Sequence, residues 1–304
     1  MPDYACVDFV LRSEIPLPEL IEVGAEAGRD IVEIRRGAVA PTGAGSLERN
    51  GDTAVLDLPD VARFRIEGGR SITVDIDAAC SERNLRLFLL GSALGILIHQ
   101  RGLFPLHANA VVMGGVAVAF TGQSGAGKST LAAHFSAAGH TVLSDDVCVI
   151  GLDTAGRPIV YPGLPRVKLW ADAAKLHGHD VGGLERIHDD MDKYQLGLPS
   201  SSDQAPVPLG AVIRLVREGE QPVGLRRLRG RAAVQVLMTE TYRPQVVSTL
   251  GLQEAHFGHC VSVAARVAVL EWTRQWGHEV FQVEVERLIR QLGEAQILGA
   301  GPDV

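Results

Sequence analysis

One short stretch of the chain combines the residue types that bind a nucleotide triphosphate. Residues 122–129 read Gly-Gln-Ser-Gly-Ala-Gly-Lys-Ser and fit the phosphate-binding loop pattern G-x-x-x-x-G-K-[ST]. The glycines let successive backbone N–H groups surround the phosphates, Lys128 reaches the outer phosphates, and the Ser129 hydroxyl ligates magnesium. The sequence therefore predicts an ATP and Mg²⁺ site made of Gly122, Gln123, Ser124, Gly125, Ala126, Gly127, Lys128, Ser129 and Thr130.

The segments on either side supply the elements that such a loop needs. Residues 116–120 (VAVAF) form a short apolar run that predicts a buried strand, and residues 131–138 (LAAHFSAA) are rich in helix-forming residues. Gly139 is typical of a helix end. Strand, loop and helix therefore follow in the required order, and a glycine-rich turn that matches by chance is the weaker interpretation.

Two adjacent carboxylates follow the predicted helix. Asp145 and Asp146 lie between the apolar stretches 141–143 and 147–150. Carboxylates at the end of a strand are costly unless they meet a cation or a proton-transfer partner. A magnesium ion at Ser129 would be that cation, whereas a solvated acidic turn is the alternative.

A histidine precedes the loop. His107 stands before a predicted strand that is joined to the next one by Met113-Gly114-Gly115, and a glycine pair suits a tight hairpin. The hairpin would hold His107 near the loop, where it can orient or transfer a proton. A purely structural histidine at the start of a strand is an equal alternative.

The order and spacing of these groups resemble the catalytic core of the HPr kinase/phosphorylase family. Members carry a histidine, a phosphate-binding loop, a helix ending in Gly-His and an Asp-Asp pair. His107 precedes Lys128 by 21 residues, Gly139-His140 follows, and Asp145 lies 17 residues after Lys128, as in the family. The resemblance implies an α/β fold, namely a P-loop domain with the mixed sheet that the family shares with phosphoenolpyruvate carboxykinase.

The resemblance also implies a role for each group. Asp145, oriented by His107, accepts the proton of a serine hydroxyl, and Lys128 stabilises the transferring phosphoryl group. Ser129 and Asp146 hold Mg²⁺. The sequence leaves open which aspartate is the base and which is the metal ligand.

A further cation often neutralises the phosphoryl group in related phosphotransferases. Arg166 and Lys193 are the candidates for this role. Solvated surface charge is the alternative for both residues.

The chain departs from the bifunctional members of the family in two places. Thr130 follows the loop serine, where those enzymes usually carry glutamate, and no Glu-Ile-Arg-Gly-Leu-Gly segment occurs downstream. The family links that segment to the phosphorylase reaction, and the nearest local feature is residues 161–170 (YPGLPRVKLW). These departures argue against phosphorolysis and remove a glutamate that helps to hold metal in the family.

The whole chain is similar to a divergent branch, the HPr-kinase-like proteins of lasso-peptide gene clusters. Looser matches over residues 17–20, 101–107, 162–170 and 208–211 carry this resemblance. It implies an ATP-dependent serine kinase that phosphorylates a ribosomal peptide precursor on its C-terminal serine. Two alternatives stay open: a serine kinase/phosphorylase acting on the HPr protein, and a nucleotide-binding regulator without phosphotransfer.

The hydrophobic content and net charge of the chain limit the kinds of partner that it could bind. Of the 304 residues, 46% are hydrophobic, which is enough for a substantial core, and the net charge of −7 argues against a general nucleic-acid binder. The partner we expect is a peptide or small protein with an acceptor serine. The resemblance also leaves a homo-oligomer open.

Cysteine spacing and hydropathy indicate the location. The cysteines form no C-x-x-C pair and fit free thiols in a reducing compartment; they are Cys6, Cys80, Cys148 and Cys260. Residues 1–6 lack the features of a signal peptide, and the most apolar segment, residues 85–98, is too short to cross a bilayer. We therefore expect a cytoplasmic protein that does not associate with membranes.

The chain divides into two predicted domains. Four short alternating segments at 30–35, 53–58, 62–66 and 71–76 indicate a small β-rich module over residues 1–80. Residues 81–304 then form the catalytic domain, beginning with a buried helix at 82–100 that we expect to pack against it, with Ser81 as N-cap and Gly102 as stop.

Further elements are predicted in the second domain. Residues 209–216 read as a central strand, 230–242 and 280–292 as helices, and 261–269 as either type.

Overall fold

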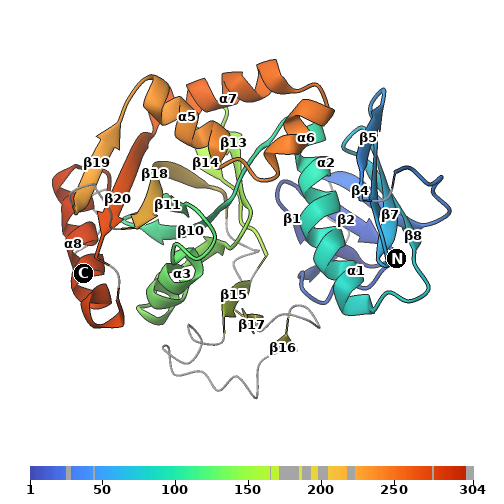
Figure 1. The fold of residues 1–304 in the computed structure, drawn as a ribbon, viewed down its shortest axis with the longest axis horizontal. Helices are drawn as coiled ribbons and strands as arrows, with labels where there is room; N and C mark the ends of the chain where they lie inside the picture. The colour runs from blue at the N-terminus through green and yellow to red at the C-terminus, as the bar shows by residue number, and fades with distance from the viewer. Residues whose placement is uncertain are drawn as a thin grey trace.

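In this computed structural model, the described residues form two large mixed β-sheets that helices join and cover, and a small third sheet (Figure 1). The structure describes residues 1–24, 29–43, 45–164, 166–170, 185–186, 193–197, 205–217, 223–275 and 277–298. Residues 166–170, 185–186, 193–197 and 278 are described by their backbone alone.

The first sheet is formed by the N-terminal residues. Its strands lie in the order β3-β1-β2-β4-β8-β7-β6-β5, and β4 pairs in parallel with β2 and β8 while the other pairs are antiparallel. In β6, β7 and β8 buried and partly exposed residues alternate, as expected for a sheet with one face on a core. The bounds are β1 (Asp3–Cys6), β2 (Phe9–Ser13), β3 (Glu22–Val23), β4 (Asp30–Arg36), β5 (Leu47–Asn50), β6 (Thr53–Leu58), β7 (Ala62–Glu67) and β8 (Ser71–Ile76).

A long helical segment follows this sheet. It consists of α1 (Glu82–Phe88), the π-helical turn η1 (Leu89–Ala93) and α2 (Leu94–Gln100). The Ser81 hydroxyl accepts a hydrogen bond from the backbone N–H of Asn84 at 3.3 Å, and Gly102 ends the segment with a φ of 73°. The predicted cap and stop are therefore confirmed.

This segment packs against the catalytic part, as expected, and against the first sheet as well. Its buried side chains complete the core of the first sheet, and the same cluster includes Val149, Val246 and Leu250 from the second half of the chain. The cause is the run of apolar residues around the whole segment, which buries more than one face. The segment therefore connects the two parts of the molecule.

The second sheet carries the phosphate-binding loop. Its main path is β12-β10-β11-β18-β14-β13-β9, and β20 pairs with both β18 and β19. β18 runs parallel to β11 and β20, and the remaining pairs are antiparallel. The bounds are β9 (Phe104–Leu106), β10 (Ala108–Met113), β11 (Val116–Thr121), β12 (Val142–Ser144), β13 (Cys148–Leu152), β14 (Pro158–Val160), β18 (Val207–Arg217), β19 (Gly224–Leu228) and β20 (Ala268–Arg274).

Helices cover both faces of the second sheet. α3 (Lys128–Ala137) and α8 (His278–Glu294) share one core with alternate residues of β11 and β18, whereas α5 (Arg231–Thr239) and α7 (Gln253–Arg266) share another with the residues between them. The short α6 (Pro244–Thr249) contributes to the core of the first sheet. A small separate sheet has the order β15-β17-β16, with bounds β15 (Arg166–Trp170), β16 (Glu185–Arg186) and β17 (Lys193–Gly197).

Most predicted elements of the second sheet agree with the structure. The hairpin between β10 and β11 pairs Met113 with Val116, and both turn glycines have positive φ values, 55° at Gly114 and 78° at Gly115. The segment 261–269, for which the sequence allows either a helix or a strand, contains the end of α7 and the start of β20.

Two further expectations concern the whole chain. The cysteines Cys6, Cys80, Cys148 and Cys260 are free thiols. Among the residues that the structure describes, no helix is both long enough and apolar enough to span a membrane.

Candidate functional site

The phosphate-binding loop connects the end of β11 to the start of α3. Three loop glycines have φ values in the left-handed region: 135° at Gly122, 77° at Gly125 and 90° at Gly127. A Cβ atom at position 122 would lie 2.8 Å from the carbonyl oxygen of Leu215. Glycine is therefore required at position 122 by conformation and by contact.

The Lys128 side chain reaches back to the start of the loop. Its Nζ donates to the carbonyl oxygen of Gly122 at 2.6 Å and to that of Gln123 at 3.3 Å, and the side chain is buried. The amide Nδ2 of the fully buried Asn109 donates to the carbonyl oxygen of Lys128. The ammonium group, which reaches the outer phosphates in such loops, therefore lies beside the first two loop residues.

The acidic pair meets the loop at the start of α3. The Ser129 hydroxyl donates to Oδ1 of Asp145 at 3.3 Å, and Asp145 is 8% exposed. The sequence-based assignment paired Ser129 with Asp146 for the metal. The structure instead brings the Ser129 hydroxyl to Asp145, and these two oxygens are the kind of ligand that Mg²⁺ prefers.

Asp146 occupies an unusual turn. Its φ is 67°, and the N–H of Val147 donates to the carbonyl oxygen of Asp145 at 2.9 Å, so Asp146 is the central residue of a three-residue turn. Aspartate tolerates the left-handed region better than most residues.

The His107 ring contacts the backbone of this turn. Its Nδ1 lies 3.0 Å from the carbonyl oxygen of Asp146, which can only accept, so Nδ1 carries the hydrogen. Burial first, and then the nearby Lys128 ammonium, lower the pKa of His107 below its usual value. The ring is therefore neutral at pH 7, and its Nε2 atom is an acceptor. The contact described for His107 is with the backbone carbonyl of Asp146, and its predicted role in orienting the Asp145 carboxylate stays a prediction.

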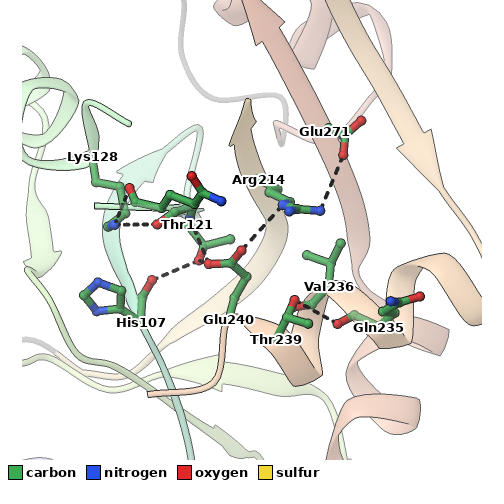
Figure 2. A network of polar contacts seen from close by, with 11 residues as sticks. His107, Thr121, Lys128, Arg214, Gln235, Val236, Thr239, Glu240 and Glu271 are labelled. Atoms are coloured by element: carbon green, nitrogen blue, oxygen red, sulfur yellow. Dashed lines mark hydrogen bonds and ion pairs between the residues drawn. The ribbon is translucent and has the colours of Figure 1, made fainter. Parts of the chain in front are cut away.

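Glu240, which the sequence analysis did not single out, connects the histidine to the loop. Its carboxylate Oε2 accepts from the Gly122 N–H at 3.1 Å and lies 2.8 Å from the Thr121 hydroxyl. Its carbonyl oxygen accepts from the His107 N–H at 2.7 Å. Figure 2 shows Thr121 between His107 and the Glu240 carboxylate.

An ion-pair ladder continues from Glu240 across the sheet. Arg214 Nε lies 3.5 Å from Glu240 Oε1, and Arg214 Nη1 lies 3.8 Å from Glu271 Oε2 (Figure 2). Arg226 Nη2 donates to Glu271 Oε1 at 2.6 Å. The ladder thus alternates carboxylate and guanidinium from the loop to β19.

A cavity of about 570 Å³ opens beside this ladder. Both arginines, both glutamates and His107 line it together with the first three loop residues, Gly122, Gln123 and Ser124. Residues of β19 and α5 complete the wall: the apolar Leu228, Ala232 and Val236 and the polar Gln235 and Thr239.

Two more arginines hold the second half of the loop. Arg217 Nη2 donates to the carbonyl oxygen of Gly125 at 3.2 Å, and Arg274 Nη2 donates to that of Ala126 at 3.5 Å. Burial lowers the pKa of Arg274, and the nearby Glu284 opposes this shift. These contacts keep the loop in its curved form.

The two phosphoryl-neutralising candidates lie in the small third sheet. Arg166 pairs with Gly197 and Lys193 with Trp170 in the strand register, and the side chains of Arg166 and Lys193 lie outside the described residues. Among the described side chains, no group of three or more histidine, cysteine, aspartate or glutamate residues could hold a metal ion.

Comparisons with known proteins find similarity among solved structures alone. No protein-family model and no curated protein matches the chain. Among solved structures, the chain is similar to "Structure of the Hpr(Ser) kinase/phosphatase from Coxiella burnetii", with 15% identity and a TM-score of 0.33 over 63% of this chain and 98% of that chain. Because this similarity is low, the site is interpreted from its own residues.

Proposed function

We propose that this chain is an ATP-dependent serine kinase that phosphorylates a peptide or small protein with the help of Mg²⁺. The observation that supports this most is the contact between Ser129 and Asp145 at the start of α3, because it brings two oxygen ligands to the end of a phosphate-binding loop. The proposal includes the HPr-kinase-like P-loop architecture and, as acceptor, the C-terminal serine of a lasso-type precursor peptide.

The proposed division of the two aspartates follows the contacts. Ser129 and Asp145 would hold the magnesium ion, which neutralises charge on the outer phosphates. Asp146 would be the base, since His107 fixes the turn that carries it. This reverses the sequence-based assignment, which remains the alternative.

The transfer step then uses residues of the chain. The serine oxygen attacks the γ-phosphorus of ATP, the bond from that phosphorus to the bridging oxygen breaks, and ADP leaves. The hydroxyl proton passes to the Asp146 carboxylate, which later returns it to water. Lys128 would stabilise charge on the moving phosphoryl group, so positioning and electrostatics supply most of the rate enhancement.

Mass spectrometry of acceptors tests the proposal. The protein is incubated with ATP and Mg²⁺ and either a synthetic peptide ending in serine or the HPr protein. We expect a gain of one phosphate on the peptide, which should be lost in Lys128→Ala. The control Arg157→Ala should keep it, because it changes an exposed cation in the connection between β13 and β14. A gain on HPr alone would indicate the HPr kinase alternative. ATP binding without transfer to either acceptor would favour a regulator.

A further inference from the structure

Two arginines and two glutamates line the cavity beside the phosphate-binding loop, so their formal charges cancel. The arginines are the more exposed of the four, and the cavity therefore presents positive charge. The side chains of Arg214 and Arg226 are 35% and 60% exposed, whereas those of Glu240 and Glu271 are 11% and 9% exposed. The carboxylates therefore lie beneath the guanidinium groups and hold them in place. Each guanidinium has five N–H donors, so donors remain for a ligand.

The position of this cavity matches the reacting end of a bound nucleotide. Gly122 and Gln123 line the cavity, and their carbonyl oxygens accept from the Lys128 ammonium that reaches the outer phosphates. A molecule in the cavity would therefore lie beside the phosphoryl group that is transferred. The acceptor hydroxyl has to approach this phosphoryl group, and the cavity offers the acceptor a place to bind.

The walls of the cavity differ in polarity. Arg214 and Arg226 stand on β18 and β19, while α5 contributes the apolar Ala232 and Val236 and the uncharged polar Gln235 and Thr239. A ligand with an anionic group and an adjoining apolar part fits these two walls. Planar guanidinium groups bind carboxylates through paired hydrogen bonds, which a lysine cannot reproduce.

We propose that Arg214 and Arg226 bind a carboxylate of the acceptor, close to the hydroxyl that receives the phosphoryl group. This rests on the proposed function, whose acceptor is a C-terminal serine, and it adds the two residues that would recognise the carboxylate of that serine. The phosphates of ATP are another anion that the same arginines could contact, and the experiment separates the two sources.

Calorimetry with matched peptides tests the proposal without requiring turnover. Protein loaded with ADP and Mg²⁺ is titrated with a decapeptide ending in serine, prepared either as the free acid or as the C-terminal amide. We expect the acid to bind about tenfold or more tightly than the amide, as for hydrogen bonds to a charged group. Arg226→Gln should remove this difference, and Arg226→Lys should keep only part of it.

The control variant is Arg157→Gln, which changes an exposed arginine that also pairs with a carboxylate at 2.7 Å. It should keep the preference for the acid. Equal binding of acid and amide to the unchanged protein would overturn the proposal. So would an Arg226→Gln variant that loses affinity for ADP but keeps the peptide preference, since the arginines would then serve the nucleotide.

The same peptides separate this proposal from the proposed function. If the acid is preferred but no phosphate is transferred from ATP, the carboxylate site stands and the kinase proposal fails. If both peptides are phosphorylated at equal rates and bind equally, the kinase proposal stands and the carboxylate site fails.

Discussion

Asp145 and Asp146 are neighbours in the chain, but the turn centred on Asp146 gives them different surroundings. Asp145 accepts from the Ser129 hydroxyl, whereas Asp146 has a positive φ and offers its carbonyl oxygen to His107. A left-handed aspartate is strained by about 1–3 kcal/mol, and such strain is common at sites of function. Two similar side chains can therefore have separate tasks.

The matched substitutions Asp145→Asn and Asp146→Asn test this separation. We expect Asp145→Asn to raise the magnesium concentration for half-maximal activity by about tenfold or more, since one charged ligand is lost. Asp146→Asn should lower kcat by roughly 10²–10⁴-fold with the magnesium requirement unchanged, as for a lost general base. The opposite pattern in magnesium titrations would restore the sequence-based assignment.

The protonation of His107 predicts the pH dependence of the reaction. Burial and Lys128 lower its pKa, so the ring stays neutral as the pH falls through its ordinary value of about 6.5 and becomes charged only below that. The neutral form is the one that fits beside Lys128, and its loss should reduce kcat/KM. When kcat/KM is measured from pH 5 to 8, we expect its decrease on the acid side to begin only below about pH 6.5.

The control for this limb is His107→Gln, which keeps a side-chain N–H for the carbonyl oxygen of Asp146 but does not titrate. The variant should retain part of the activity, and the histidine component of the acid limb should disappear. An unchanged acid limb in the variant would assign it to another group.

At the scale of elements, local patterns predicted the strand, loop and helix that carry Lys128. The contiguous apolar run at 116–120 and the glycine pair at 114–115 specify their own conformations. Glu240 and Arg214 were missed because their roles depend on long-range pairing. The register of β11 and β18 sets Arg214 beside Thr121, and no local signal predicts that neighbour.

The helical segment α1–η1–α2 also depends on a contact that the sequence does not show. A Cβ atom at Gly95 in α2 would lie 2.8 Å from Cε1 and 3.1 Å from Cδ1 of Tyr242, whose ring centroid lies 6.0 Å from that of His107. Glycine at position 95 therefore lets the helix approach the side of the molecule that carries the candidate site.

Gly95→Ala tests this close approach. We expect it to destabilise the protein by about 1–3 kcal/mol, because the Tyr242 ring must move. The control Gly258→Ala lies in α7 with no atom within 4 Å of the added Cβ, and it should be neutral or stabilising by up to about 1 kcal/mol. Urea unfolding measures both, and equal effects would contradict the packing argument.

At the scale of the whole molecule, the N-terminal sheet reaches the candidate site. The end of β1 contributes Cys6, and the turn to β2 contributes Val7, to a small cavity of about 50 Å³ that Asp145 and Asp146 also line. Val7 has a φ of 53°, which is rare for a β-branched residue. The N-terminal part therefore lines a cavity together with the acidic pair, as well as packing against α1 and α2.

The domain boundary predicted at residues 80 and 81 can be tested against the packing. Gln100 at the end of α2 donates to the carbonyl oxygens of Asp52 and Ile66 and accepts from the N–H of Gly69, so the helix is fastened to the first sheet. Arg101 adds an ion pair with Asp30 at 2.9 Å. These contacts favour an N-terminal unit that ends after the helix, whereas the boundary at residues 80 and 81 stays a prediction.

We therefore expect a fragment of residues 1–102 to unfold cooperatively in a thermal melt, and a fragment of residues 1–80 not to do so. The shorter fragment exposes the core that Leu85, Leu89 and Leu97 cover, and each such side chain contributes roughly 1.5–3 kcal/mol when buried. Their sum is comparable to the whole stability of a small domain, about 5–15 kcal/mol. A cooperative transition of similar midpoint in the two fragments would instead support the boundary at residue 80, because the first sheet would then be stable without the helix.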